Sequence, residues 1–509
     1  MTQRQFKKEI PSKGLHRLAH AFGLLVVGAL LVSTAPALAG PWAAPGDTGL
    51  RHDLQLLSDH GLLSAPLTTW PLSWSDISAN LKTTGEEDRL PPHILNALQR
   101  TQARLKKAAD GSLRARVEVG GNSHPELMRS FADKPRSEGE ISVGAEGGNP
   151  WLAYRLQATA AANPEDDRTA RLDGSHASML LGNWAFSAAM VDRWWGPGWD
   201  GSLILSSNAR PVPSLVLQRN RSTPFSFPLL KWLGPWQFTT FMGQLESDRV
   251  VPDPLLFGMR LNFRPAKGLE IGLSRTAQWC GEGRPCDLGT FGKLLLGIDN
   301  VDADLAKADE PGNQLGGYDI RWAGSVMRQP GAFYAQVIGE DESGGLPSRL
   351  FGMAGIETSG AWQDSGASWR AYLEMANTTG GLLRDETFYN MVYNHGIYRS
   401  GYRYRDKSLG HGADNDSKIQ TLGMLLGDRH AHVWHLTGRR AEFNRDDGGL
   451  NPFSPRHRKY RSLELRHERP FYSGQITMDI GVHHSRLVAE GSSETDPSLA
   501  LMWKRDYQF

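Results

Sequence analysis

The sequence has little of what a nucleic-acid-binding surface or a bundle of membrane helices requires. Its 56 Lys and Arg residues face 55 Asp and Glu residues, so the formal net charge is +1, and no cationic excess is available for a phosphate backbone. One apolar run near the N-terminus aside, no stretch approaches the ~20 apolar residues of a spanning helix. The mean hydropathy is −0.42. These values exclude a polytopic helical membrane protein but not a β-barrel, whose strands are apolar on one face only.

Catalytic signatures are also missing. The chain contains no G-x-S-x-G elbow, no H-E-x-x-H helix and no phosphate-binding P-loop. Acidic residues are plentiful, but no pair can be nominated as a glycosidase acid and nucleophile from sequence alone. We therefore expect a protein that is not an enzyme and that carries no cofactor and no metal ion.

The N-terminus has the layout of a cleavable export signal. Basic residues precede an apolar run over 21–32, and Ala37 and Ala39 supply the small residues that a signal peptidase recognises. We expect residues 1–39 to be removed before Gly40. A single membrane anchor is the alternative, but the apolar run is shorter than the bilayer requires.

Cysteine occurs only at positions 280 and 286. In an oxidising compartment, a pair this close favours a small disulfide-closed loop between Cys280 and Cys286. Zinc would require two further ligands nearby, and none has suitable spacing. The mostly acidic run 299–310 follows within the irregular stretch 277–315. We interpret this stretch as a solvated surface loop stiffened by the disulfide.

Residues 50–107 show helical periodicity in three short pieces. Leucines at 50, 54, 57, 62 and 63 form one apolar stripe, prolines interrupt it, Asp76 begins a second piece and Pro91-Pro92 opens a third. We expect a small α-helical bundle over 40–111, on the periplasmic side of the next domain.

From residue 112 to 509 the pattern changes to alternating strands. In 369–375, for example, apolar residues occupy the odd positions and polar or charged residues the even ones. Tight turns alternate with long irregular stretches, as in transmembrane barrels with short periplasmic turns and long external loops. The longest stretches are 277–315 and 377–417, and we also count 485–496 among the long ones.

Eighteen antiparallel strands follow from this pattern, so the fold class is an all-β transmembrane barrel. The fifth and sixth of these strands are inferred partly because short turns and long loops must continue to alternate in the later part of the chain. The expected ranges are 113–121, 138–146, 151–161, 177–191, 203–207, 212–219, 235–245, 255–264, 269–276, 316–328, 331–339, 350–358, 366–376, 418–427, 430–440, 460–469, 473–484 and 497–509. The chain ends in Phe509 with alternating aromatic residues before it, which is similar to the recognition signal of outer-membrane barrels.

Three segments carry a family resemblance. Residues 192–211, which begin Asp-Arg-Trp-Trp-Gly-Pro-Gly-Trp, resemble the hallmark of the capsule-assembly Wzi family, and segments 243–260 and 393–405 agree with it. The resemblance implies an eighteen-stranded outer-membrane barrel with a helical bundle at its periplasmic end. It also implies lectin-like attachment or assembly of capsular polysaccharide or exopolysaccharide at the cell surface, without catalysis.

The tryptophan-rich hallmark has two interpretations. Its aromatic and polar residues are suited to stacking on sugar rings and to bonding hydroxyls or a carboxylate. Its glycines and prolines equally suit a rigid structural turn that enters the lumen, and we favour this role because loop parity places the start of the segment near the periplasmic side. The residues concerned are Arg193, Trp194, Trp195, Trp199, Asn208 and Arg210.

The external stretch 377–417 is the better candidate for polysaccharide binding. Its aromatic and basic residues can stack on saccharides and pair with acidic ones. A lid or plug folded into the lumen for stability alone is the alternative. The candidate residues are Tyr389, Tyr393, His395, Tyr398, Arg399, Tyr402, Arg403, Tyr404 and Arg405.

We thus expect a monomeric outer-membrane protein whose partners are a surface polysaccharide, membrane lipid and polysaccharide export proteins, with no nucleic acid. A diffusion channel for oligosaccharides is the main alternative, and a filled lumen would argue against it. An outer-membrane enzyme acting on glycan or lipid is the third hypothesis, and it requires a nucleophile and a base within hydrogen-bonding reach.

Overall fold

The computed structural model describes residues 41–82, 89–296, 312–326, 329–340, 342–343, 346–347, 349–382 and 384–509. The expected signal peptide, its cleavage position before Gly40 and the acidic run 299–310 lie outside these residues.

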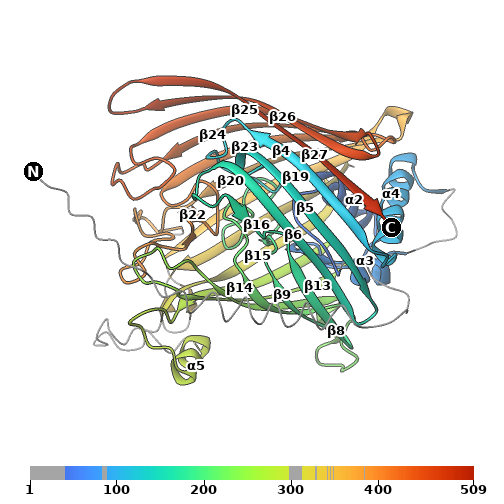
Figure 1. Ribbon diagram of the computed structural model, residues 1–509, viewed down its shortest axis with the longest axis horizontal. Helices are drawn as coiled ribbons and strands as arrows, with labels where there is room; N and C mark the ends of the chain where they lie inside the picture. Colours follow the sequence, from blue (N-terminus) through green and yellow to red (C-terminus); the bar gives the residue numbers. More distant parts are fainter. Residues whose placement is uncertain are drawn as a thin grey trace, which may run out of the picture. The chain divides into compact units, whose positions relative to one another are not determined.

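Within the described part of the chain, eighteen antiparallel strands of six or more residues close into a barrel (Figure 1). The two-residue strand β7 (Ala170–Arg171) lies between β6 and β8. The barrel strands are β4 (Arg114–Asn122), β5 (Ser137–Asn149), β6 (Leu152–Pro164), β8 (His176–Leu181), β9 (Trp184–Ala189), β11 (Ser214–Arg219), β12 (Trp236–Gln244), β13 (Leu255–Ala266), β14 (Leu269–Trp279), β15 (Gly312–Val326), β16 (Gln329–Glu340), β19 (Leu350–Trp362), β20 (Ala367–Asn377), β23 (Ser417–Gly427), β24 (Val433–Phe443), β25 (Arg458–Phe471), β26 (Gly474–Leu487) and β27 (Ser493–Gln508).

The two faces of each strand differ as a membrane barrel requires. On β26, Ile480 and Val482 are about half exposed on the outside, whereas Asp479 and His483 are buried towards the lumen. Large exposed aromatics gather at the short turns, among them Trp151, Trp362 and Tyr472. This apolar outer surface with an aromatic girdle is typical of a barrel in lipid. Among the described residues, none of the helices is both long and apolar enough to cross a membrane.

The two ends of the barrel differ in their connections. We call the end with the short turns, such as those after Asn149 and Ala266, the turn end, and the opposite end the loop end. The barrel closes where β27 pairs with β4, in a register that sets Leu501 opposite Gly121. One expected long stretch is shorter than predicted, because β26 and β27 extend to residues 487 and 493. Their polar ends continue the ladder beyond the apolar part of the strands.

The strand count is confirmed, but two of the expected strands are wrong. The expected strand 177–191 is a hairpin, because Gly182 at φ +58° turns the chain between β8 and β9. The expected strand 203–207 does not join the barrel wall. Its residues are buried, and Leu205 makes only an isolated bridge to Trp195. One strand is gained and one is lost, so the total remains eighteen.

This correction changes the direction of the hallmark segment. Because β9 runs towards the loop end, the connection between β9 and β11 leaves the barrel at the loop end, not at the periplasmic side as loop parity suggested. We call residues 190–213 the lumen segment. It then runs inside the barrel, where β10 (Trp194–Trp195) pairs with β2 (Thr69–Trp70).

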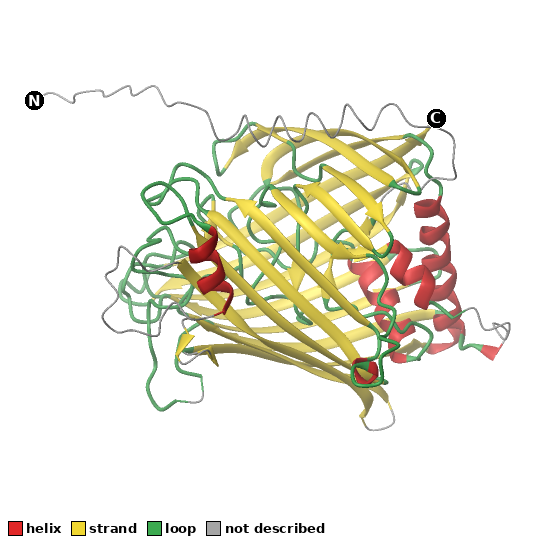
Figure 2. Cartoon of the chain, turned by 90° about the horizontal axis from the view of Figure 1, so that it is seen from below, coloured by secondary structure: helices red, strands yellow, loops and turns green. Residues whose placement is uncertain are grey.

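The three expected N-terminal helices are present and gather at one end of the barrel (Figure 2). They are α2 (Thr48–Asp59), capped by Asp47, α3 (Trp74–Asn80), capped by Ser73, and α4 (Pro92–Ala109), which starts at the second proline of its pair. Residues 48–58 of α2 are all buried, which places this helix inside the turn end. The short strands β1 (Trp42–Ala43) and β3 (Leu72–Ser73) pair beside them.

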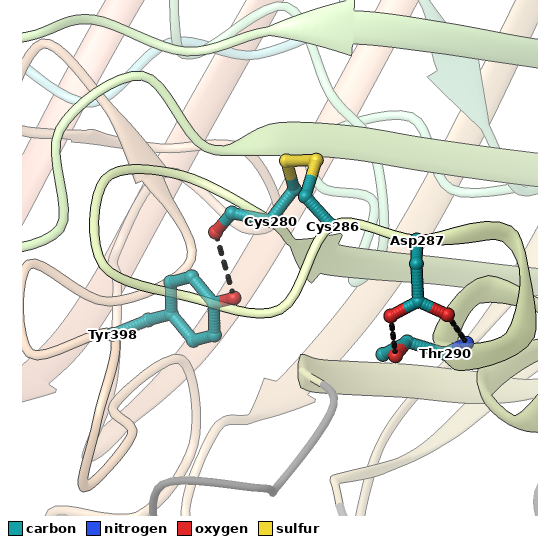
Figure 3. The surroundings of a disulfide bond; sticks show 5 residues. All are labelled: Cys280, Cys286, Asp287, Thr290 and Tyr398. Atoms are coloured by element: carbon teal, nitrogen blue, oxygen red, sulfur yellow. Dashed lines mark hydrogen bonds between the residues drawn. A yellow bond between two sulfur atoms is a disulfide. The ribbon is translucent and has the colours of Figure 1, made fainter.

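The disulfide between Cys280 and Cys286 is present at the loop end (Figure 3). Asp287 then accepts hydrogen bonds from the backbone N–H and the hydroxyl of Thr290, at 2.9 and 2.6 Å, and so caps the start of α5 (Leu288–Leu296). The Tyr398 hydroxyl donates to the Cys280 carbonyl at 3.0 Å. The disulfide-closed loop is thereby tied to residues 378–416, which we call the long loop.

Candidate functional site

The hallmark tryptophans lie inside the barrel and are almost completely buried. Trp194 and Trp195 are 0% exposed and Trp199 is 3% exposed. Arg51 of α2 donates to the carbonyls of Pro197 and Gly198 at 2.7 and 2.8 Å, and its guanidinium lies 4.2 Å from the centre of the Trp199 ring. The tryptophans therefore join the lumen segment to the helical bundle.

Wall carboxylates hold the turn of the lumen segment. The Glu374 carboxylate accepts from the backbone N–H groups of Trp199 and Gly201 at 2.7 and 2.8 Å. Gly201 has no room for a side chain, since a Cβ atom would lie 2.2 Å from Nε2 of His411. A glycine is therefore required at position 201, because the lumen segment packs closely between the wall and the long loop there.

An ion pair to a neighbouring part of the wall fixes the same turn, because Glu374 on β20 pairs with Thr421 on β23, which pairs with Arg439 on β24. Arg439 on β24 donates to both oxygens of Asp200, the shortest contact being 2.7 Å, and Thr421 adds a hydrogen bond of 2.7 Å. Burial alone would raise the pKa of Asp200, but the Arg439 guanidinium outweighs it and holds that pKa below its usual value. The carboxylate therefore stays charged.

The long loop folds onto the lumen segment. The hydroxyls of Tyr393 and Tyr402 donate to the carbonyls of Leu203 and Ile204 at 2.6 and 2.9 Å. Arg403 pairs with Asp414. The short strands β21 (Arg403–Tyr404) and β22 (Lys407–Ser408) form a hairpin within this loop. These contacts bury part of the long loop against the lumen segment.

A groove opens where the loops meet, and we call it the loop-end groove. It consists of a cavity of about 440 Å³ and a smaller one of about 40 Å³, which share Leu127, Glu165, Asn208 and Lys407 in their walls. The walls come from the β4–β5, β6–β7 and β24–β25 connections, the lumen segment, the long loop and the loop ends of β25, β26 and β27. The groove therefore exists only when segments far apart in the sequence have folded together.

The two parts of the groove carry opposite charge. The walls of the larger, acidic part contain Glu126, Glu165, Asp406, Asp414, Glu494 and Asp496, against Lys407 and Arg458. The smaller, basic part contains Arg129, Arg136, Arg171, Arg210, Arg405 and Lys407, against Glu165 and Asp166. Burial, and after it the neighbouring Arg136, lowers the pKa of Arg129 to about 10. These cations belong to a network of ion pairs, in which Arg136 contacts Asp192 and Arg210 contacts Asp166 and Asp173, and their remaining N–H groups can donate to a ligand.

Aromatic rings form the floor of the acidic part. Half-buried Phe453 packs on Phe443 and Tyr460, with ring centroids 4.5 and 6.3 Å apart. Because Phe453 and Tyr460 both line the cavity, an apolar face is available beside carboxylates and cations. Aromatic faces combined with planar polar side chains are suited to sugar rings, whose faces are apolar and whose edges carry hydroxyls.

Four of the residues expected from the sequence line the groove, namely Asn208, Arg210, Tyr404 and Arg405. The others lie elsewhere. Tyr393, Tyr398 and Tyr402 are at most 1% exposed, and Arg403 is buried. Arg193 lies in the lumen with its guanidinium 4.3 Å from the Phe241 ring. Tyr389, His395 and Arg399 are partly or fully accessible but do not line the groove.

Most of the groove has no sequence motif. Phe453 lies in the β24–β25 connection and Tyr460 near the loop end of β25, whereas Lys407 lies in the candidate stretch 377–417 but outside the residues expected there. His483 faces the lumen and bonds to Tyr460, whereas its neighbour His484 is exposed. No group of three or more possible metal ligands occurs among the residues that the structure describes.

A serine and a histidine also lie side by side at this end. Ser498 Oγ is 2.6 Å from Nε2 of His483, and the Tyr460 hydroxyl is 2.7 Å from its Nδ1. Acyl transfer also requires N–H donors directed at a developing oxyanion. Ser498 lies inside the β26–β27 ladder, paired with Gly481, so backbone groups there serve the sheet. The pair therefore meets only one of the requirements of a hydrolase.

Fold and site together define a class: closed β-barrels of the outer-membrane type, filled by their own chain and carrying a polar groove with an aromatic floor at the loop end. Residues 110–493 match the family described as capsule assembly protein Wzi. The chain belongs to this family.

Two comparisons agree with the family. The chain is 32% identical over 335 residues to an uncharacterised 55.8 kDa protein in the cps region of Klebsiella pneumoniae, a match that spans 65% of this chain and only 64% of that relative. Its fold is similar to that of Wzi, an outer-membrane protein of Escherichia coli described as a carbohydrate-binding β-barrel involved in group 1 capsule assembly. The TM-score is 0.78 at 25% identity, covering 92% of this chain and 99% of that structure.

Proposed function

We propose that this protein binds a capsular or related surface polysaccharide in the loop-end groove and holds it at the cell surface without cleaving it. The groove, with its aromatic floor and its acidic and basic parts, is the observation that carries this proposal. The carbohydrate binding described for the Escherichia coli relative supports it.

The orientation and the partners belong to the same proposal. The chain is exported by a signal peptide cleaved before Gly40, and the barrel lies in the outer membrane as a monomer with its helical bundle in the periplasm. The apolar outer surface contacts lipid, and the loop end faces outwards. Polysaccharide export proteins are its protein partners, and it binds no nucleic acid.

The filled lumen favours attachment over transport. The lumen segment and the long loop bond to each other and to the wall, so an open pore for oligosaccharides would require both to move. Catalysis is disfavoured because the Ser498–His483 pair lacks free backbone donors around it. Incubation of the protein with polysaccharide should therefore leave the polymer length unchanged.

The decisive experiment is binding of the host's own surface polysaccharide to the purified full-length protein in detergent, with bilayer conductance measured on the same preparation. We expect saturable binding and no steady conductance. Phe453→Ala should weaken binding at least about tenfold, because it removes the apolar floor. Phe227→Ala, which removes an exposed ring at the turn end, is the matched control and should bind normally. Conductance without binding would refute the proposal.

A further inference from the structure

A second large cavity lies at the turn end, and we call it the turn-end cavity. Its volume is about 620 Å³, within the range of roughly 300–1,000 Å³ that holds small-molecule ligands. It lies between the helical bundle and the barrel wall: Trp42 and Trp74 come from β1 and α3, whereas Arg116, Arg155 and Asp506 come from β4, β6 and β27. Ligand sites are frequent at such boundaries between structural units.

The cavity reaches the turn end of the barrel. A neighbouring cavity of about 170 Å³ shares Asp47, Arg104, Glu468, Gly474 and Gln475 with it. Gly474 and Gln475 follow the β25–β26 turn, and Arg104 lies on α4. The shared walls therefore place an entrance beside this turn and this helix.

Two tryptophans distinguish this cavity from an ordinary water-filled space. Trp42 and Trp74 are both only half-buried, although Ala43 of β1 and both residues of β3 are buried. Trp42 packs with one part of its ring against His176, the ring centroids being 5.3 Å apart. Two partly accessible indole rings in one cavity provide faces on which a ring-shaped ligand can stack.

The remaining walls define the chemistry of that ligand. They consist largely of ion pairs, such as Arg116 with Asp506 at 2.6 Å and Lys504 with Asp133 at 2.7 Å. Such walls disfavour a lipid chain, because polar groups would lose water without gaining partners. Paired guanidinium and carboxylate groups nevertheless offer donors and acceptors to hydroxyl groups. A ligand with apolar ring faces and hydroxylated edges fits both features.

We propose that the turn-end cavity is a second carbohydrate-binding site, which accepts a short run of sugar rings from the side of the membrane opposite the loop-end groove. Trp42 and Trp74 stack on the sugar rings, and the charged walls bond the hydroxyls. The upper end of the cavity meets the basic part of the groove at Arg136 and Arg171, which line both. One protein would thus contact saccharide at both ends of its barrel.

The test is calorimetric titration of the full-length protein in detergent with oligosaccharides prepared by partial hydrolysis of the host's surface polysaccharide. We expect two binding events per chain. Trp42→Ala should weaken one of them about tenfold. Gln475→Trp, which narrows the entrance without removing a tryptophan, should weaken the same event. Gln508→Trp, at an exposed position outside both cavities, is the matched control.

The outcomes separate this inference from the proposed function. Phe453→Ala should remove only the other event. If Phe453→Ala removes all binding, the groove stands and the turn-end cavity holds solvent only, which overturns the inference. If only the Trp42 and Gln475 variants lose binding, the inference stands and the groove proposal fails. A titration without any binding overturns both.

Discussion

Replacing Asp200 with asparagine should destabilise the protein by detaching the lumen segment from the wall. The side chains of Asp200 and Arg439 are 2% and 4% exposed, and they form a bidentate pair. Removing one partner of a buried ion pair costs about 3–5 kcal/mol, because the other charge remains buried. Arg439 keeps its contact with Glu464, and asparagine retains one acceptor oxygen. We therefore expect a loss of about 3 kcal/mol, at the lower end of that range.

The assay is urea unfolding in detergent, followed by tryptophan fluorescence, with Asp248→Asn as the matched control at an exposed position. The control should change the free energy of unfolding by less than about 0.5 kcal/mol. Because the folded-state pKa of Asp200 is lowered, its stabilising effect is present above the unfolded pKa and is lost as the pH falls through the folded value. The difference between wild type and variant should therefore shrink in acid. A variant as stable as wild type at neutral pH would refute the reasoning.

Three further predictions concern the connections around the site. Arg136→Ala combined with Arg171→Ala should give a small ion conductance in planar bilayers, because these side chains lie where the turn-end cavity meets the groove; bilayers without conductance would contradict it. Serine at both Cys280 and Cys286 should destabilise the disulfide-closed loop by about 2 kcal/mol, read by local proteolysis, with an unchanged barrel midpoint. Burial, and then Asp446, raises the pKa of Asp416 to about 7, so this carboxyl's stabilising effect is complete below its unfolded value and lost as the pH rises through 7. Proteolysis of residues 444–457 should accelerate as the pH rises towards 7 and level off above it, and Asp416→Asn should abolish that dependence.

The architecture could be predicted because a lipid-facing strand imposes a strict period of two and because the turns differ in length at the two ends. The alternation of apolar and polar residues does not show where one strand ends and the next begins in a tight hairpin. Residues 176–189 alternate across the Gly182 turn, so they look like one strand. The expected strand 203–207 is apolar for another reason: it packs inside the lumen against other segments of the chain.

The candidate site was only partly predictable for a related reason. Tyr393 and Tyr402 look like sugar-binding residues by composition, yet their hydroxyls bond to the lumen segment. An aromatic residue that packs a plug and one that binds a saccharide have the same sequence signature. Phe453, by contrast, gains its position only from the fold, because the β24–β25 connection brings it beside β26 and β27. Residues such as Asn208 and Arg210 were found because the hallmark segment reaches the groove at its far end.

The seam between β27 and β4 sets an order of events during biogenesis. These strands pair residues such as Leu501 and Gly121, which lie far apart in the sequence, so the sheet remains open until β27 pairs with β4. Pairings of such high contact order form late, since the entropy of closing a long loop opposes them. Asp200 of the lumen segment contacts Arg439 and Thr421, which belong to the wall. The polar contacts of the lumen therefore form only when residues 190–213 meet the curved sheet, and they favour the curvature at which the seam can close.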